Sequence, residues 1–289
     1  MNKKCLGGKY SAPTVILFVL ILCTTIISEN RQEISAYLGG GLSMLNYDSE
    51  FGKTKVNTGA LGGLGGFGYS HFFTDLLGIS TGAEIAMYNS RFSLNDGYTV
   101  RFPAIDPEGT DFIFRSTISG YYEKHRSLML QIPLMIRLRL GGETRQFYFA
   151  LGGKGAIPIH SRTIGSTANL MNGGFYEKEN YEHTQQTQMG FGRQTAKGFE
   201  KNMNFNLTGF ASAEAGVKFR LNDSYQIFTG IYFDYGLRKI WLRNDKNLVE
   251  YNRNNPRDFT MNSVLDSFVS EIRPMAVGLK IGVAFGKGK

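Results

Sequence analysis

A strict alternation of apolar and polar residues between positions 128 and 140 constrains this chain more than any other feature of its sequence. Every second residue of the segment is Leu or Ile, and Arg137 and Arg139 lie among the residues between them. A period of two predicts an extended strand with one apolar and one polar face. At about 3.3 Å per residue and a tilt of roughly 45°, a strand of this length covers the hydrocarbon core of a bilayer, about 30 Å thick. The pattern is therefore typical of a strand in a transmembrane β-barrel.

Seven other segments show the same alternation, so we expect eight strands. They span residues 34–45, 60–73, 78–90, 128–140, 146–159, 205–221, 225–237 and 275–285. The strand at 60–73 is rich in glycine, and its segment 63–68 matches the dinucleotide-binding fingerprint by letter. The residues that follow it are strand-like rather than helical, which argues against a nucleotide site.

The connections between these strands alternate in length. Those at 74–77, 141–145 and 222–224 are short, whereas long polar segments lie near 46–58, 91–120, 160–203 and 238–270. Outer-membrane barrels combine tight periplasmic turns with long extracellular loops, and long loops are uncommon in compact soluble domains. The sequence thus predicts an all-β fold, an eight-stranded antiparallel up-and-down transmembrane β-barrel in the outer membrane with both termini periplasmic.

Charged residues recur on the faces that are expected to line the barrel interior. Beside lipid, an unpaired Arg or Lys would cost roughly 2–4 kcal/mol at the membrane midplane. Inside an eight-stranded barrel, whose interior side chains fill, acids can instead neutralise Arg137, Arg139 or Lys218. The alternative for any single charge is a place at a strand end in the membrane interface. The expected lumen charge network consists of Glu84, Arg137, Arg139, Lys154, Glu214, Lys218 and Asp234.

The first 28 residues have the pattern of a secretory signal peptide. Three lysines precede an almost wholly apolar run at 15–27, which is shorter than the roughly 20 residues of a spanning helix. We expect residues 1–28 to be removed and residues 29–289 to form the barrel domain. Two alternatives stay open, an uncleaved anchor helix and lipidation at Cys23. Because both cysteines lie in this leader, no disulfide is expected in the mature chain.

Composition narrows the function classes. The formal net charge is +8 and the chain has no run of Lys and Arg, which argues against nucleic-acid binding. The chain has 36 glycines among its 289 residues, a larger share than the average of about 7 %. Glycine suits barrels because neighbouring backbones approach closely there. A mean hydropathy of −0.20 excludes a helical membrane protein.

Four stretches of the chain carry a resemblance to a known family. They are 130–134 with Arg137, 78–84 with Tyr88 and Ser90, 234–237 with Ile240, and 278–282. Over nearly the whole length after the leader, the chain resembles the small outer-membrane β-barrel domain proteins, which include PorT-like and OmpA-like eight-stranded barrels. The last strand is also similar to the barrel-assembly signal, with Lys280, Gly282 and Phe285 at the matching positions. It departs from that signal because Gly-Lys-Gly-Lys follows Phe285.

The resemblance implies a non-enzymatic structural or interaction component of the cell envelope, and PorT-like relatives imply service to a larger envelope or secretion assembly. It carries no catalytic residue, cofactor or metal ligand. The expected partners are outer-membrane lipid and lipopolysaccharide, the barrel-assembly machinery, and envelope or secretion proteins.

Two alternative functions stay open: a narrow porin-like channel, and a hydrolase or acyltransferase with an active site at the rim. A catalytic base needs a positioned partner, and sequence spacing does not supply one for a histidine of this chain. The four candidates are His71, His125, His160 and His183.

Overall fold

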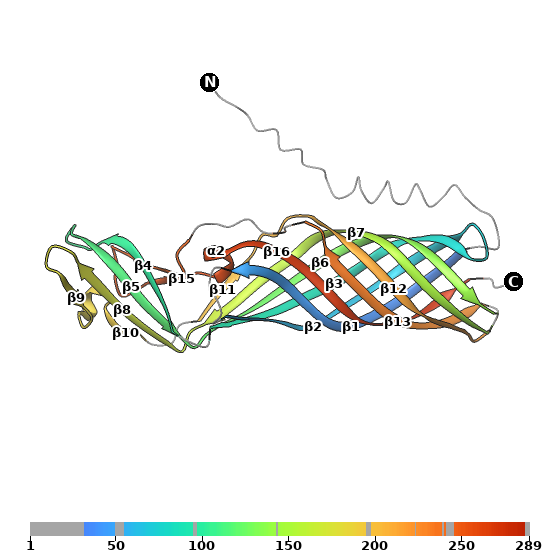
Figure 1. The fold of residues 1–289 in the computed structure, drawn as a ribbon, viewed down its shortest axis with the longest axis horizontal. Helices are drawn as coiled ribbons and strands as arrows, with labels where there is room; N and C mark the ends of the chain where they lie inside the picture. Colours follow the sequence, from blue (N-terminus) through green and yellow to red (C-terminus); the bar gives the residue numbers. More distant parts are fainter. Residues whose placement is uncertain are drawn as a thin grey trace, which may run out of the picture.

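The computed structural model describes residues 32–49, 55–94, 97–142, 144–194, 198–222, 224–238, 240 and 246–286. The expected signal peptide, with both cysteines, and residues 287–289 lie outside these ranges. Almost all of the regular structure is antiparallel β-strand (Figure 1). In the described part of the chain, no helix is long and apolar enough to cross a membrane.

Eight long strands form a closed ring. Each pairs with the next along the chain, and the last pairs back with the first, so every one of the eight has a neighbour on both sides. This confirms the expected eight-stranded, antiparallel, up-and-down β-barrel (Figure 1). The strands are β1 (Gln32–Ser49), β2 (Lys55–Phe72), β3 (Leu77–Leu94), β6 (Tyr121–Gly141), β7 (Arg145–Ser166), β12 (Thr208–Arg220), β13 (Tyr225–Gly236) and β16 (Val269–Phe285).

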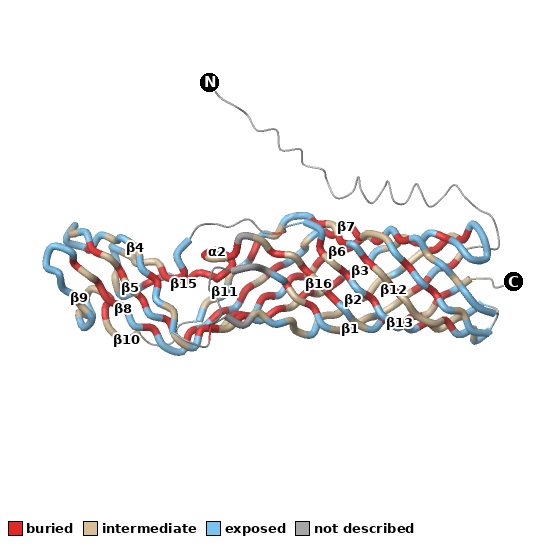
Figure 2. Tube along the Cα trace, viewed as in Figure 1, coloured by how far each residue is buried: buried red, intermediate tan, exposed pale blue. Residues whose placement is uncertain are grey.

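The burial of side chains follows the predicted period of two (Figure 2). On β6, Leu134 is 66 % exposed and the next residue, Met135, is 4 % exposed. An exposed apolar surface of this extent is unusual for a protein in water and is what a hydrocarbon environment requires. All eight strands contribute to the apolar outer surface, for example through Leu38, Phe67, Ile85, Leu134, Leu151, Phe219, Ile231 and Leu279.

Several strands are longer than the sequence predicts, and the extra residues lie at the end that carries the long connections. β6 begins at Tyr121 rather than at 128, β7 runs to Ser166 rather than to 159, and β16 begins at Val269 rather than at 275. The extensions carry polar residues on their outer face, so a search for apolar alternation stops short of them. β12 differs in the other direction, because it starts at Thr208 instead of 205.

The long connections contain regular structure, which the sequence did not predict. Parts of two of them form a second sheet in the order β10–β8–β5–β4, with β9 beside β8. We call this the outer sheet; it lies beyond one end of the barrel, whereas the short turns lie at the other end (Figure 1). Its strands are β4 (Tyr98–Ile105), β5 (Asp111–Ser119), β8 (Asn169–Tyr176), β9 (Tyr181–His183) and β10 (Gly192–Gln194).

Short elements complete the same end of the molecule. β11 pairs with the extension of β7 and so joins the barrel wall, and β14 pairs with β15. These elements are η2 (Thr187–Met189), β11 (Gly198–Asn202), β14 (Val249–Glu250), β15 (Thr260–Met261) and α2 (Val264–Ser267).

The outer sheet has an aromatic core of its own. The ring of Phe112 lies 5.2 Å from that of Tyr176, 5.7 Å from that of Phe191 and 5.2 Å from that of Tyr251. The Tyr176 hydroxyl donates to the buried carboxylate of Asp106 at 3.1 Å. Aromatic clusters of this kind bury a large apolar area with defined geometry, so the outer sheet is a packed unit rather than a set of loose loops.

Replacing Phe112 by Ala should loosen the outer sheet and leave the barrel closed. Loss of a buried Phe side chain typically costs about 3–5 kcal/mol, and the ring contacts of Phe112 are made outside the barrel. In limited proteolysis in detergent, we expect faster cleavage within 98–119 and 169–194, with the heat-modifiable gel migration of the barrel retained. Tyr181→Ala, at a side chain 60 % exposed on the same sheet, is the control. Loss of heat-modifiable migration in Phe112→Ala would contradict a separately packed outer sheet.

Candidate functional site

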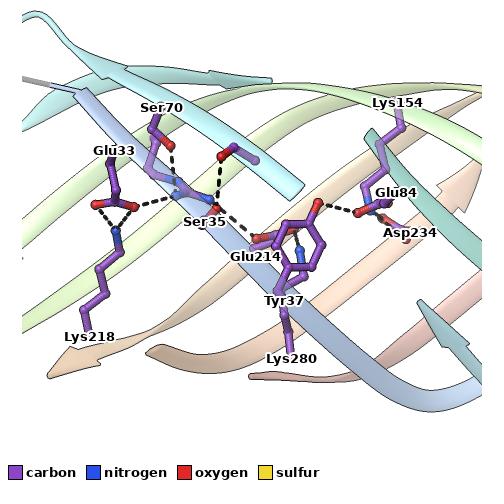
Figure 3. Close-up of polar contacts among 12 residues, drawn as sticks. Glu33, Ser35, Tyr37, Ser70, Glu84, Lys154, Glu214, Lys218, Asp234 and Lys280 are labelled. Atoms are coloured by element: carbon purple, nitrogen blue, oxygen red, sulfur yellow. Dashed lines mark hydrogen bonds and ion pairs between the residues drawn. The ribbon is translucent and has the colours of Figure 1, made fainter. Parts of the chain in front are cut away.

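Inside the barrel, Lys154 on β7 lies between two carboxylates from distant strands (Figure 3). Its Nζ donates to Oε1 of Glu84 on β3 at 2.6 Å and to Oδ2 of Asp234 on β13 at 3.0 Å. The Tyr37 hydroxyl on β1 donates to the other oxygen of Glu84 at 2.9 Å. All three charged groups are buried, so the cluster ties four strands together across the lumen.

Arg137 on β6 links two further ion pairs. Lys280 donates to Glu214, and Lys218 donates to both carboxylate oxygens of Glu33. The Arg137 guanidinium lies 3.6 Å from Oε1 of Glu33 and 4.0 Å from Oε2 of Glu214. Because the Arg137 guanidinium contacts both acids, the two pairs form one connected cluster. Figure 3 shows Glu33 beside Lys218 and Glu214 beside Lys280.

The lumen clusters balance in charge. Removal of a charge from water costs several kcal/mol, on the order of 20 for an isolated ion, unless a partner in good geometry offsets it. Each buried charge of the two clusters has such a partner. The acids are Glu33, Glu84, Glu214 and Asp234, and the bases are Arg137, Lys154, Lys218 and Lys280.

Side chains fill the space around these charges. Tyr88, Tyr148 and Tyr232 are buried in the interior. A cavity beside Tyr37 and Arg137 has a volume of about 20 Å³, which is close to the space that one water molecule needs. The interior at this level is therefore packed.

The structure corrects the expected pairing of the lumen charges. The acids Glu84 and Asp234 contact Lys154 rather than Arg137, Arg139 or Lys218. Lys218 contacts Glu33, which sequence reasoning missed because Glu33 lies one residue before the expected strand 34–45. Its place in the polar phase of that strand, two residues before Ser35, was the available signal.

Of the two arginines expected in the lumen network, one lies near an expected acid and the other lies elsewhere. Arg137 does lie near Glu214, at 4.0 Å. Arg139 instead has its guanidinium 3.4 Å from the centroid of the Phe72 ring, close to the short-turn end. Of the residues expected to form an assembly signal, Lys280 is paired in the lumen, and Phe285 is exposed with its ring 5.3 Å from that of Tyr225. Gly282 lies where a Cβ would come within 2.5 Å of the Ala36 carbonyl oxygen and of the Phe228 ring, so packing by itself favours glycine there.

A third buried cluster holds α2 in the mouth of the barrel, at the outer-sheet end. The carboxylate of Glu123 on β6 accepts hydrogen bonds from the Tyr121 hydroxyl, from Ser263 Oγ at 2.9 Å and from the Val264 N–H at 2.8 Å. Ser263 caps α2 by accepting from the Leu265 N–H at 3.1 Å. Glu123 thus anchors the N-terminus of α2 to the inner wall.

His125 lies beside Glu123. Its Nε2 is 3.4 Å from Oε2 of Glu123, and its Nδ1 is 3.0 Å from the Thr163 hydroxyl. Both side chains lie beyond the apolar band, since the outer face of β6 at this level carries Lys124 and Arg126, which are exposed. Burial raises the pKa of Glu123 to about 7 and lowers the pKa of His125 to about 3, because each charged form loses its hydration.

Ser263, Glu123 and His125 are residue types of a hydrolase, but their arrangement is that of an anchor. A nucleophilic serine needs a hydrogen bond to its base, whereas Ser263 donates to Glu123. All three residues are buried. Among the described residues, no group of three or more His, Cys, Asp and Glu side chains could hold a metal ion.

The other histidines lie far apart along the molecule. His71 is near the short-turn end, with its ring 5.3 Å from that of Phe73. His160 is exposed on β7. His183 on the outer sheet lies 3.2 Å from Oε2 of Glu179.

Comparison with known proteins gives weak likenesses. No protein-family model matches the chain, and no curated protein matches it. Among solved structures, the attachment invasion locus protein Ail of Yersinia pestis is similar at 10 % identity and a TM-score of 0.28, over 88 % of this chain and 99 % of that one. Neisserial surface protein A is similar at 9 % identity and a TM-score of 0.33, over 88 % of this chain and 96 % of that one. The outer membrane protein OprG of Pseudomonas aeruginosa is similar at 11 % identity and a TM-score of 0.32, over 89 % of this chain and 97 % of that one. The fold assignment rests on the strand pairing described above.

Removal of the Glu84 carboxylate should be among the most costly lumen changes. Glu84→Ala leaves Lys154 with Asp234 as its one acidic partner and removes the acceptor of the Tyr37 hydroxyl. Breaking a buried ion pair typically costs about 3–5 kcal/mol of folding free energy. We expect a clear fall in unfolding temperature in detergent. Glu179→Ala, at a side chain 61 % exposed in the turn between β8 and β9, should change it little. Equal effects of the two substitutions would mean that Glu84 is hydrated in solution.

The stability of the contact between α2 and Glu123 should depend on pH, and His125 should offset most of this dependence in the parent protein. When α2 leaves the wall, the pKa of Glu123 returns from about 7 to 4.5 and that of His125 from about 3 to 6.5. The raised pKa of Glu123 stabilises the closed mouth below pH 4.5, and this stabilisation is lost as pH rises to 7. The lowered pKa of His125 stabilises it above pH 6.5, and this is lost as pH falls. Between pH 4.5 and pH 6.5 the two effects on the free energy of opening cancel.

In His125→Phe the cancellation is removed. At about 1.4 kcal/mol per pH unit, the free energy of opening should fall by roughly 3 kcal/mol between pH 4.5 and 7, whereas the parent protein stays nearly level over most of that range. Hydrogen exchange of the amides at 262–268, followed by mass spectrometry and corrected for intrinsic rates, measures this. Glu123→Gln is the counterpart control and should show no fall toward pH 7. A level profile in His125→Phe would contradict the raised pKa of Glu123.

Proposed function

We propose that this protein is an integral outer-membrane β-barrel that neither conducts nor catalyses, and that holds the outer sheet at the cell surface for interaction with a partner. The observation that carries the proposal is the closed ring of eight strands with an apolar outside and a packed, charge-balanced inside. Both chain ends would then be periplasmic, because β1 begins and β16 ends beside the short turns (Figure 1).

The distribution of polarity supports the membrane location. Exposed Leu, Ile and Phe side chains lie on all eight strands, while the charged side chains of the same segments point inward. On β6 the apolar outer face runs from Leu128 to Leu140, about the length that a tilted strand needs to cross a bilayer. A soluble barrel would bury the first set and expose the second.

The interior supports a non-conducting role. Eight strands enclose a space that side chains fill, and here ion pairs and tyrosines occupy it. The mouth is further covered by α2, which Glu123 anchors. A channel would require both obstructions to move, and a rim enzyme would require Ser263 to be exposed and bonded to His125.

The outer sheet supports an interaction role. Binding residues are often carried by connecting segments on a rigid scaffold, and this sheet is joined to the barrel where β5 leads into β6 and β7 leads into β8. It exposes large side chains of the kind that interfaces favour, namely Ile105, Met171 and Tyr181. An envelope or secretion assembly, as in PorT-like proteins, is the class of partner we propose.

Planar-bilayer recording on refolded protein tests the non-conducting role. We expect no reproducible single-channel steps from the parent protein. Glu123→Ala should also stay silent, because freeing α2 leaves the lumen clusters beneath it in place. Stable steps that vanish when a lumen residue such as Ala150 is enlarged would overturn the proposal.

A matched fractionation tests location. The parent protein should be recovered in the outer membrane with heat-modifiable migration. Recovery in the soluble periplasm would overturn the membrane assignment independently of the conductance result.

A further inference from the structure

Four basic side chains gather on the outside of the barrel just beyond the apolar band. We call Arg91 on β3, Lys124 and Arg126 on β6, and Arg162 on β7 the basic rim. They continue the outward phase of these strands beyond Met87 and Leu128, the last apolar residues that face each other in register. On β3 the polar Asn89 lies between Met87 and Arg91. Arg91, Lys124 and Arg126 are exposed, and the Arg162 side chain is 38 % exposed.

The strand register sets these cations directly against one another. Arg91 is paired with Lys124, and Arg126 is paired with Arg162. Like charges directly opposite each other on neighbouring strands are destabilising, and here two such pairs stand side by side. In the described part of the chain, the carboxylate that pairs with the basic rim is Glu200, 2.8 Å from Arg162. That pair is solvent-exposed and contributes little.

The basic rim also lines a hollow. Its four residues, together with neighbours that include Asn89, Leu61 and Ile164, line a partly open cavity of about 270 Å³. The Arg126 Nε donates to Asn89 Oδ1 at 3.3 Å, which holds one guanidinium at the edge of this cavity. Leu61, at the border with the apolar band, is 76 % exposed. The hollow is thus cationic on one side and apolar on the other.

We propose that the basic rim binds the phosphate groups of an anionic lipid headgroup in the leaflet on the outer-sheet side. An anion between Arg126 and Arg162 relieves their mutual repulsion, and guanidinium groups bind phosphate through paired N–H donors. The lipid chains would lie along the apolar band next to Leu61. The inference rests on the proposed membrane-spanning function and adds a ligand site to it.

Titration with lipid A, a diphosphorylated glycolipid, tests the site in protein held in a neutral detergent. Native mass spectrometry should detect lipid A retained by the parent protein. Arg126→Gln combined with Arg162→Gln should weaken retention by about tenfold or more. Arg101→Gln combined with Lys178→Gln, the same charge change at exposed positions on β4 and in the turn between β8 and β9, should retain it as the parent protein does.

Thermal unfolding supplies a second readout, because the order of stability of the parent protein and the double variant should depend on whether lipid A is present. Without lipid A, the double variant at Arg126 and Arg162 should be at least as stable as the parent protein, because one like-charged pair has gone. Added lipid A should raise the unfolding temperature of the parent protein and of the outer-sheet control, and not that of the variant.

Equal retention of lipid A by the parent protein and the double variant would overturn the site. Full competition by inorganic phosphate at the same concentration would assign it to free phosphate and overturn the lipid assignment. Flotation of the parent protein with liposomes separates these results from a failure of the proposed function, since a protein that does not insert would remain at the bottom of the gradient.

Discussion

The pairing of β16 with β1 is the constraint on which the rest of the structure depends. In lipid, each backbone polar group must find its partner within the protein, so an open sheet edge is not tolerated. The closing seam runs in register from Ile34 opposite Phe285 to Asp48 opposite Glu271. At its middle Gly41 faces Gly278, and a Cβ on Gly41 would come within 2.2 Å of the Val277 carbonyl oxygen. Side-chain-free positions therefore let the first and last strands approach closely enough to close the ring.

Closure determines what the interior can contain. Once the ring is complete, one face of every strand points into the same narrow space, and residues far apart in sequence become neighbours. Lys218 and Glu33, which are 185 positions apart, form an ion pair across it. A charge placed there is removed from water and must be balanced on the spot, which explains why acids and bases occur in equal number in the lumen clusters. The same clusters link strands that share no backbone hydrogen bonds, as Lys154 links β7 to β3 and β13.

The barrel could be predicted from the sequence because its signal is local. Alternation reveals a strand and its two faces without any knowledge of neighbours, and the contrast of short and long connections orders the strands. The ion-pair partners could not be predicted, since the height at which Glu84 meets Lys154 depends on strand stagger and tilt, which alternation does not encode. The outer sheet was missed for a related reason. Its strands are short, carry charges such as Arg101 and Arg115, and become buried only through contacts such as that of Phe112 with Tyr251.

The two surfaces of the barrel wall change character at the same height. Outside, Met87 and Leu128 are the last apolar pair before Arg91, Lys124 and Arg126 follow. Inside, the lumen clusters give way to Glu123 and the α2 anchor at the level of those cations. A strand that only crossed a membrane would end there, yet β3, β6 and β7 continue toward the outer sheet. In the proposed orientation this height coincides with the lipid headgroups, so the wall both leaves the hydrocarbon and starts to support the outer sheet at one boundary. A headgroup bound at the basic rim would therefore act on the base of the outer sheet as well as on the barrel.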